Sequence, residues 1–212
     1  MAFKFFVNGT TNNNWSSTSN WSLTSGGATG ATVPNSADDV FFDNNSPNCF
    51  LDGTSVKQSA SLTFTSGYTN QFTLGARIIV LSGLTLGANM LPISGLTGEF
   101  RIFTTGPVPT FTITTNGKSI PNLLIQNTTK IITLNDDLNI SGMLAGSITP
   151  GTNLGFVGGK NINIYGWLDL RGCTWTGDCI FNYYAPYGIY TTSGGTISNT
   201  LNILGATKYK TF

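Results

Sequence analysis

Apolar and other residues alternate along short stretches throughout this chain. In each stretch one residue separates two apolar ones, which places the apolar pair on one face of an extended strand. Gly, Asn, Asp or Ser bounds each stretch, as in tight turns, and apolar residues with helical spacing are nearly missing. The pattern predicts an all-β protein built from many short strands. The pairs are Leu62/Phe64, Phe72/Leu74, Phe100/Ile102, Phe111/Ile113, Leu123/Ile125, Leu138/Ile140, Ile162/Ile164, Leu168/Leu170 and Leu201/Ile203.

A degenerate motif, aliphatic-x-aliphatic-x-Gly, recurs along the chain. Two inward aliphatic residues followed by a corner residue describe one short face of a β-solenoid coil. The 24 residues from Leu138 to Ile162 are a plausible coil length, whereas the other intervals are irregular. In a variant at 123–127, Asn127 replaces glycine at a position that suits a positive φ. The copies begin at Ile79, Leu91, Leu138, Ile162 and Leu201.

These repeats favour a short β-solenoid, similar to a right-handed parallel β-helix, with an N-terminal cap. The alternative is a β-sandwich or jelly roll, because short strands that end in glycine also arise in other sheets rich in Thr, Gly and Ile. Only 9% of the residues are charged, and the runs of Asn, Thr and Ser could stack as polar ladders, which favours the solenoid. We expect a capping or anchoring segment over 1–45 and a solenoid body over 46–212 with an aromatic C-terminal part.

The N-terminal segment repeats Asn-Trp-Ser and then runs through a glycine-rich stretch into an acidic and aromatic strand. Trp15 and Trp21 are six residues apart, so they lie on one face of an extended chain, and we expect them to cap the β structure. The order N-W-S, Gly/Ala/Thr-rich stretch, V-P-x-x-A-D-D-V-x-F-D resembles the N-terminal region of phage structural proteins and of some bacterial surface β-helix proteins. The matching residues are Trp15, Asn20, Trp21, Val33, Pro34, Ala37, Asp38, Asp39, Val40, Phe42 and Asp43.

This resemblance brings no catalytic residues with it. It implies a non-enzymatic structural protein of a bacteriophage particle, such as a tail fibre, spike or capsid decoration protein, that acts in assembly and surface contact. Other virion proteins would be its partners, and a homotrimer is expected because fibres usually form around closed rotational symmetry. The alternatives are a glycan-binding receptor module or a polysaccharide depolymerase, and a fragment of a bacterial surface adhesin.

Composition argues against several kinds of site. Histidine is absent, which removes the commonest general base and metal ligand and makes a Ser-His-Asp or Cys-His site impossible. The net charge is +1 and the Lys and Arg residues are scattered, so nothing favours nucleic-acid binding. No stretch approaches the roughly 20 apolar residues that span a bilayer, and no secretory signal is visible. We expect no cofactor, no metal and no membrane insertion, and a protein made in the host cytoplasm and located in the virion.

Carboxylates are the only groups that could act as a general acid or base. A polysaccharide-cleaving enzyme needs two of them, about 5–9 Å apart beside a groove. Asp136 and Asp137 lie between two predicted strands and are typical of a turn, and Asp169 is expected to pair with Arg171 on the outer side of a strand. The acidic residues of 38–43 match no Ca²⁺ loop and favour a turn at the entry to a strand. No catalytic residue is therefore predicted.

Three cysteines occur in the chain. An odd number without a CxxC motif argues against a disulfide framework or a zinc site. Cys173 and Cys179 could pair across a short loop, but buried free thiols fit better.

Aromatic residues near the C-terminus form the candidate contact surface. Tyr and Trp provide contact area at low entropic cost and can stack on sugar rings. A β-structure core or covering loop, a subunit interface and a glycan-binding patch all remain open for this cluster. The candidates for an interface or glycan contact are Trp167, Trp175, Tyr183, Tyr184, Tyr187 and Tyr190.

Overall fold

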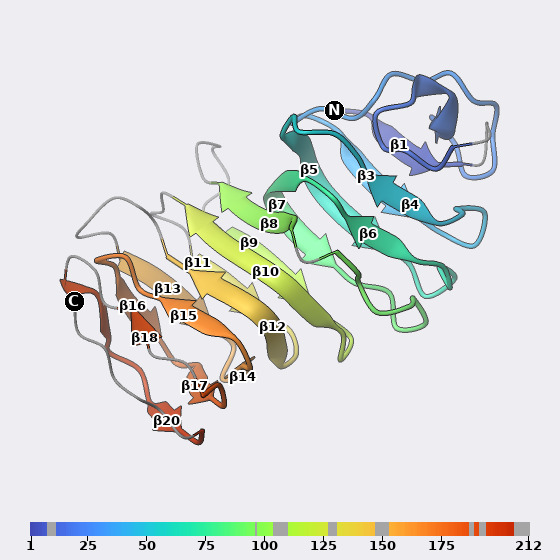
Figure 1. Ribbon diagram of the computed structural model, residues 1–212. Helices are drawn as coiled ribbons and strands as arrows, with labels where there is room; N and C mark the ends of the chain where they lie inside the picture. Colours follow the sequence, from blue (N-terminus) through green and yellow to red (C-terminus); the bar gives the residue numbers. More distant parts are fainter. Residues whose placement is uncertain are drawn as a thin grey trace.

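The computed structural model describes residues 1–7, 12–95, 97–103, 110–126, 131–146, 153–186, 189–190 and 194–205. Parallel strands stack from coil to coil as a β-solenoid, with β1 and β20 at opposite ends (Figure 1). The predicted all-β solenoid is thus confirmed. Helical structure in the described part is limited to 3₁₀ geometry, as in the single turn η1 (Thr18–Asn20), and no helix there is long and apolar enough to cross a membrane.

The strands are short and follow one another closely along the chain. They are β1 (Phe3–Phe6), β2 (Trp21–Ser22), β3 (Asp39–Phe42), β4 (Cys49–Leu51), β5 (Lys57–Phe64), β6 (Phe72–Leu74), β7 (Arg77–Thr85), β8 (Glu99–Phe103), β9 (Thr110–Thr114), β10 (Ser119–Gln126), β11 (Ile131–Leu134), β12 (Leu138–Ala145), β13 (Asn153–Val157), β14 (Asn161–Ile164), β15 (Trp167–Asp169), β16 (Thr174–Gly177), β17 (Ile180–Tyr183), β18 (Ile189–Tyr190), β19 (Thr196–Ile197) and β20 (Leu201–Ile203).

Each coil passes through three faces in turn. On face 1 the parallel pairings run β1–β3–β5–β7–β9–β11–β13–β16–β19. On face 2 they run β10–β12–β14–β17–β20, and the separate pair β4–β6 takes the corresponding place in earlier coils. On face 3 they run β5–β7–β8–β10–β12–β15–β18. The long strands β5, β7, β10 and β12 each bend around a corner and so serve two faces.

The length of a coil follows from the register of these pairings. Leu138 pairs with Ile162, so the 24-residue interval seen in the sequence is one coil, as predicted. The next step on face 2 is shorter, because Asn161 pairs with Ile180, only 19 residues later. The residues that differ in number lie in the loops between faces, and this hides the repeat in the sequence.

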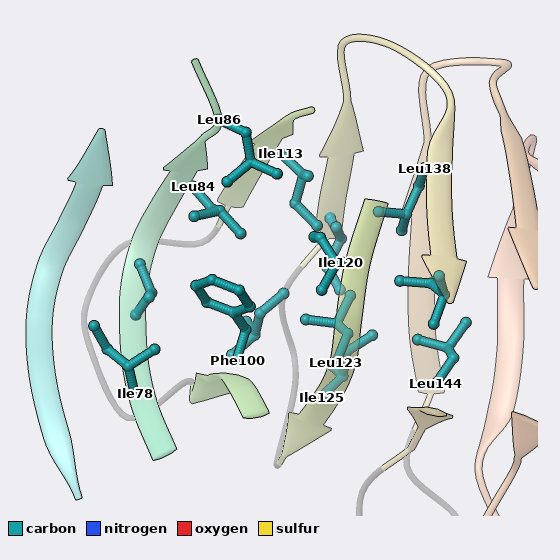
Figure 2. Packing of buried hydrophobic residues seen from close by; sticks show 14 of the residues in the cluster. Ile78, Leu84, Leu86, Phe100, Ile113, Ile120, Leu123, Ile125, Leu138 and Leu144 are labelled. Atoms are coloured by element: carbon teal, nitrogen blue, oxygen red, sulfur yellow. The ribbon is translucent and has the colours of Figure 1, made fainter. Parts of the chain in front are cut away.

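The core occupies the inside of the solenoid along its whole length. Every predicted alternating pair is buried except Leu201/Ile203, which lies in the last described strand. Figure 2 shows how the side chains of successive coils pack on one another, with Phe100 and Leu123 facing inward from neighbouring strands. Removing each such side chain from water contributes roughly 25 cal/mol per Å² of apolar surface.

Two copies of the predicted motif differ from the structure. In β7, Ile78 and Val80 point into the core, whereas Ile79 and Leu81 are only half-buried. The run 78–81 is apolar at every position, so alternation alone does not show which pair points inward. The bulge that follows Val80 leaves the inward phase of β7 unchanged, because Leu84 beyond it is buried as well. The copy that begins at Leu91 is not a strand. Asn127 lies outside the described residues.

Glycine at a solenoid corner is required by close approach of the backbone. A Cβ atom added to Gly166 would lie 1.9 Å from the carbonyl oxygen of Gly142 in the preceding coil. Any side chain there would force the coils apart. The corner between faces 2 and 3 therefore selects glycine in both coils.

The N-terminal end of the core is covered by aromatic side chains. Trp15 and Trp21 are fully buried and meet edge to face with ring centroids 4.7 Å apart, and Trp21 Nε1 donates a hydrogen bond of 2.7 Å to the Trp15 carbonyl oxygen. Trp21 also packs on Phe6, and β2 pairs antiparallel with β1. The segment 1–45 also supplies β1 and β3 to the main sheet.

Candidate functional site

The predicted aromatic cluster is divided between the core and the surface. Trp175 and Tyr183 have no exposed surface, because β16 and β17 point them inward, so they cannot form a surface contact; this corrects their assignment as contact candidates. Trp167 and Tyr184 are 42% and 39% exposed. Tyr187 lies outside the described residues, and Tyr190 belongs to β18, but its side chain lies outside the described part.

An asparagine ladder runs along the outside of face 2. Asn139, Asn163, Asn182 and Asn202 occupy equivalent positions in successive coils. The Nδ2 atoms of Asn163, Asn182 and Asn202 each donate to the Oδ1 atom of the preceding coil, with distances of 2.9, 3.0 and 2.9 Å. The amide group suits this because it carries both donors and an acceptor, and parallel strands repeat about every 4.8 Å. The sequence predicted polar ladders, and the structure identifies these residues.

Two tyrosines, Tyr165 and Tyr184, lie two residues after the ladder asparagines, just beyond the ends of β14 and β17. The rings of Tyr165 and Tyr184 are stacked, with centroids 5.0 Å apart and planes 11° from parallel. Tyr165 is 48% exposed. The backbone holds this register, because Tyr165 N donates to Ile140 O (2.9 Å) and Tyr184 N donates to Ile164 O (2.8 Å). Face 2 thus presents an amide row beside an aromatic row.

The aromatic row continues around the corner of the solenoid onto face 3. Gly166 forms the corner, and Trp167 follows it as the first residue of β15, where it pairs with Met143 of the preceding coil. We call the exposed residues Tyr165, Trp167 and Tyr184 the aromatic corner. Tyr165 was missed in the sequence, although its place between a buried isoleucine and the corner glycine is the signal for an outward side chain.

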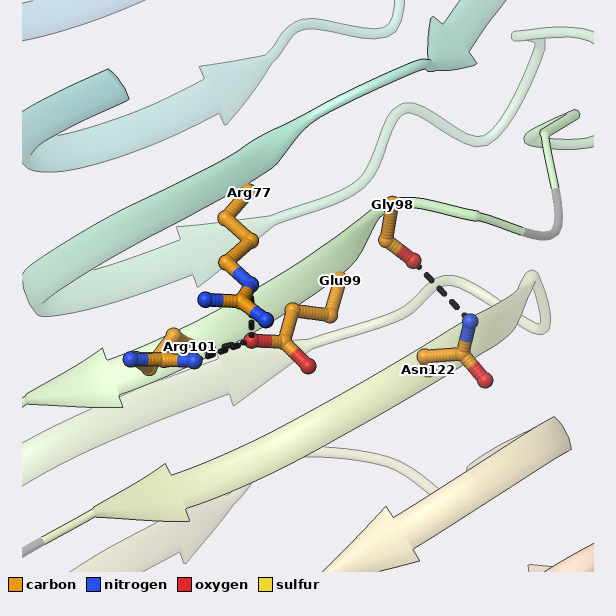
Figure 3. Close-up of polar contacts among 5 residues, drawn as sticks. All are labelled: Arg77, Gly98, Glu99, Arg101 and Asn122. Atoms are coloured by element: carbon orange, nitrogen blue, oxygen red, sulfur yellow. Dashed lines mark hydrogen bonds and ion pairs between the residues drawn. The ribbon is translucent and has the colours of Figure 1, made fainter. Parts of the chain in front are cut away.

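A bulge lies next to the aromatic corner, in the preceding coil. Ile120 pairs with Ile140 and Asn122 with Met143, so Pro121 alone faces the two residues at 141–142. Asn122 fixes the bulge, because its Oδ1 accepts from Met143 N at 2.9 Å. Its Nδ2 donates to Gly98 O, also at 2.9 Å (Figure 3). The residue beside Tyr165 in that coil is the exposed Ser141.

The carboxylates have structural partners. Glu99 is held between Arg77, at 3.1 Å, and Arg101 on the outside of face 3 (Figure 3). The predicted pairing of Asp169 with Arg171 is confirmed at 2.8 Å. All nine carboxylates of the chain lie in the described part, and each accepts a hydrogen bond or ion pair from the protein. They are Asp38, Asp39, Asp43, Asp52, Glu99, Asp136, Asp137, Asp169 and Asp178.

Several of these carboxylates connect neighbouring coils. Asp136 accepts from Thr115 N in the preceding coil, and Asp137 accepts from Asn161 N in the following coil, both at 2.8 Å. Both lie at the bend between β11 and β12, as predicted. Asp178 accepts from the backbone N–H of Gly159, and this bond holds the pKa of the exposed carboxyl below its usual value. The acidic residues thus act as staples between coils.

The cysteines are free and buried, as the sequence favoured for Cys173 and Cys179. Burial raises the pKa of the Cys49 thiol well above its ordinary value, and burial also raises that of Cys179. A raised thiol pKa lowers the population of the reactive thiolate. The described residues contain no group of three His, Cys, Asp or Glu side chains that could hold a metal ion.

The chain is a parallel β-solenoid with exposed aromatic side chains at one corner. Comparisons with protein-family models, with curated proteins and with solved structures find no match to this chain. Its function is therefore inferred from the residues and their geometry.

Proposed function

We propose that this chain is a non-enzymatic structural module of a bacteriophage particle, acting as a fibre, spike or decoration component on tail or capsid. The observation that carries the proposal is the use of every carboxylate as a structural partner. Together with the absence of histidine, it leaves the chain without an uncommitted general acid and base. The resemblance of the N-terminal segment to phage structural proteins supplies the kind of particle.

The architecture suits a rigid building block. Hydrogen bonds link each coil to the next through the backbone, the asparagine ladder and the acidic staples. Few charges are left on the surface, so its contacts depend on shape and on neutral polar and aromatic groups. In the particle the module would contact other virion proteins, and the homotrimer expected from fibre symmetry is part of this proposal.

The test is the protein composition of purified phage particles that carry this gene. Quantitative mass spectrometry is expected to find the chain in a fixed number of copies per particle. Hundreds of copies would indicate a capsid decoration, and about three to eighteen copies would indicate a tail or vertex component. Absence of the chain from purified particles would refute the proposal.

A depolymerase is the competing function, and it makes a different prediction. It requires release of reducing sugar ends from host polysaccharide and loss of that release in Asp169→Asn. Because Asp169 is paired with Arg171, we expect no release from the unmodified chain.

A further inference from the structure

We propose that the aromatic corner binds a neutral chain of hexopyranose sugars, with one sugar ring stacked on the face of Tyr165 that points toward Ser141. The inference specifies the surface contact of the proposed function and rests on it in that respect. The binding itself is a property of the isolated chain and can be measured without a particle.

The free face of the Tyr165 ring follows from the stacking. Tyr184 covers the face of Tyr165 toward the next coil, because the two rings are parallel with centroids 5.0 Å apart. The opposite face looks over the preceding coil, where the equivalent residue is the short side chain of Ser141. One aromatic face is therefore accessible, and the apolar C–H face of a pyranose ring fits such a surface.

Polar groups lie on the same side as this free face. Asn139 is the first residue of the asparagine ladder, and its Oδ1 accepts from Asn163. Within the described chain its Nδ2 atom donates to no other residue, so its two N–H groups are available to a ligand. The hydroxyl of Ser141 is also exposed. A sugar ring on Tyr165 would find donors and an acceptor for its hydroxyl groups.

The charge around the corner favours an uncharged sugar. Asp169, two residues after Trp167, is neutralised by Arg171. Asp137, before the start of β12, accepts hydrogen bonds from the backbone N–H and the side-chain amide of Asn161. Arg171, the cation nearest to Trp167 in the chain, is already paired with Asp169, so an acidic or sulfated glycan gains no ion pair from it.

The site is exposed, so its affinity for a single chain is expected to be weak. A dissociation constant of about 1 mM corresponds to a shallow contact. Many copies on one particle would raise the apparent affinity by about 10²–10⁴. Weak single sites on a repeated module are thus sufficient for attachment to a surface.

The experiment is a titration of the purified chain with maltohexaose, cellohexaose and chitohexaose, followed by ¹H–¹⁵N NMR. At least one of these sugars is expected to shift the amide signals of 139–142 and 163–167. Tyr165→Ala is expected to weaken binding by about tenfold or more, whereas Tyr165→Phe keeps the ring and should stay within about twofold. Phe3→Ala, an exposed aromatic residue at the other end, is the matched control and should bind normally.

The inference is overturned if none of the three sugars shifts these signals, or if Tyr165→Ala binds like the unmodified chain. It is also overturned if the aromatic corner instead joins two copies, which sedimentation would show as a dimer that Tyr165→Ala dissociates. Sugar binding by a chain that is absent from purified particles would refute the proposed function and leave this site intact. Presence of the chain in particles without sugar binding would refute this site and leave the proposed function intact.

Discussion

Two groups of aromatic residues, one at each end of the solenoid, have opposite surroundings. Trp15 and Trp21 at the N-terminal end are fully buried and rest on the core. Tyr165, Trp167 and Tyr184 in the later coils are 39–48% exposed and lie outside the sheet. Aromatic rings in contact with one another therefore close the core at one end and form an exposed surface in the later coils. The direction of the strand face, rather than the residue type, decides which role they take.

The largest effect is expected from removing an indole of the cap. Trp21→Ala should lower the free energy of unfolding by about 3–5 kcal/mol, because it leaves a cavity against Phe6 and Trp15 and removes the indole hydrogen bond. Chemical denaturation measures the loss. A loss below about 1 kcal/mol would mean that Trp21 is not part of the core.

A smaller effect is expected in the asparagine ladder. Asn163→Ala removes the bonds to both Asn139 and Asn182, so it should cost about 1–2 kcal/mol. Asn202→Ala, at the end of the described ladder, removes one bond and should cost about half as much. Denaturation of the two variants side by side tests this ratio. Equal losses in the free energy of unfolding would contradict the view that each hydrogen bond of the ladder contributes separately.

The aromatic corner should contribute still less to stability. Tyr184→Ala removes the stack on Tyr165 and should cost about 0.5–1.5 kcal/mol, because much of the ring is already in water. The same thermal or chemical unfolding assay applies. A cost equal to that of Trp21→Ala would remove the distinction between cap and corner.

The smallest effect concerns pH and Asp178. The bond from Gly159 lowers the pKa of this carboxyl below 3.8, so the folded state favours its charged form. The resulting stabilisation is present above pH 3.8 and is lost as the pH falls through the lower folded value. In Asp178→Asn this contribution to acid sensitivity should disappear, which unfolding curves between neutral and acidic pH would measure. An unchanged pH dependence would contradict this account.

The sequence predicted the fold well because inward and outward residues alternate along most of the strands. The 24-residue interval from Leu138 to Ile162 is one coil, since both residues belong to unbulged stretches of face 2. The pattern fails in 78–81, where every residue is apolar and alternation does not identify the inward pair. The pairing with the neighbouring coil decides which residues point inward, and local alternation cannot show it.

The aromatic corner was only partly predictable for a related reason. Tyr183 and Tyr184 are adjacent, so one must point inward and the other outward, but the two residues alone do not show which. The choice follows from the register with Ile164 and Tyr165 in the preceding coil. Residues 19 to 24 positions apart must be aligned to see this.

Oxidative footprinting of the intact particle tests the contrast between the two ends most directly. Brief exposure to hydroxyl radicals followed by mass spectrometry measures how fast each aromatic residue is modified. We predict fast modification of Trp167, Tyr165 and Tyr184 and protection of Trp15 and Trp21. Fast modification of Trp15 and Trp21, or protection of the aromatic corner equal to theirs, would contradict the assignment of the corner as the outward contact surface.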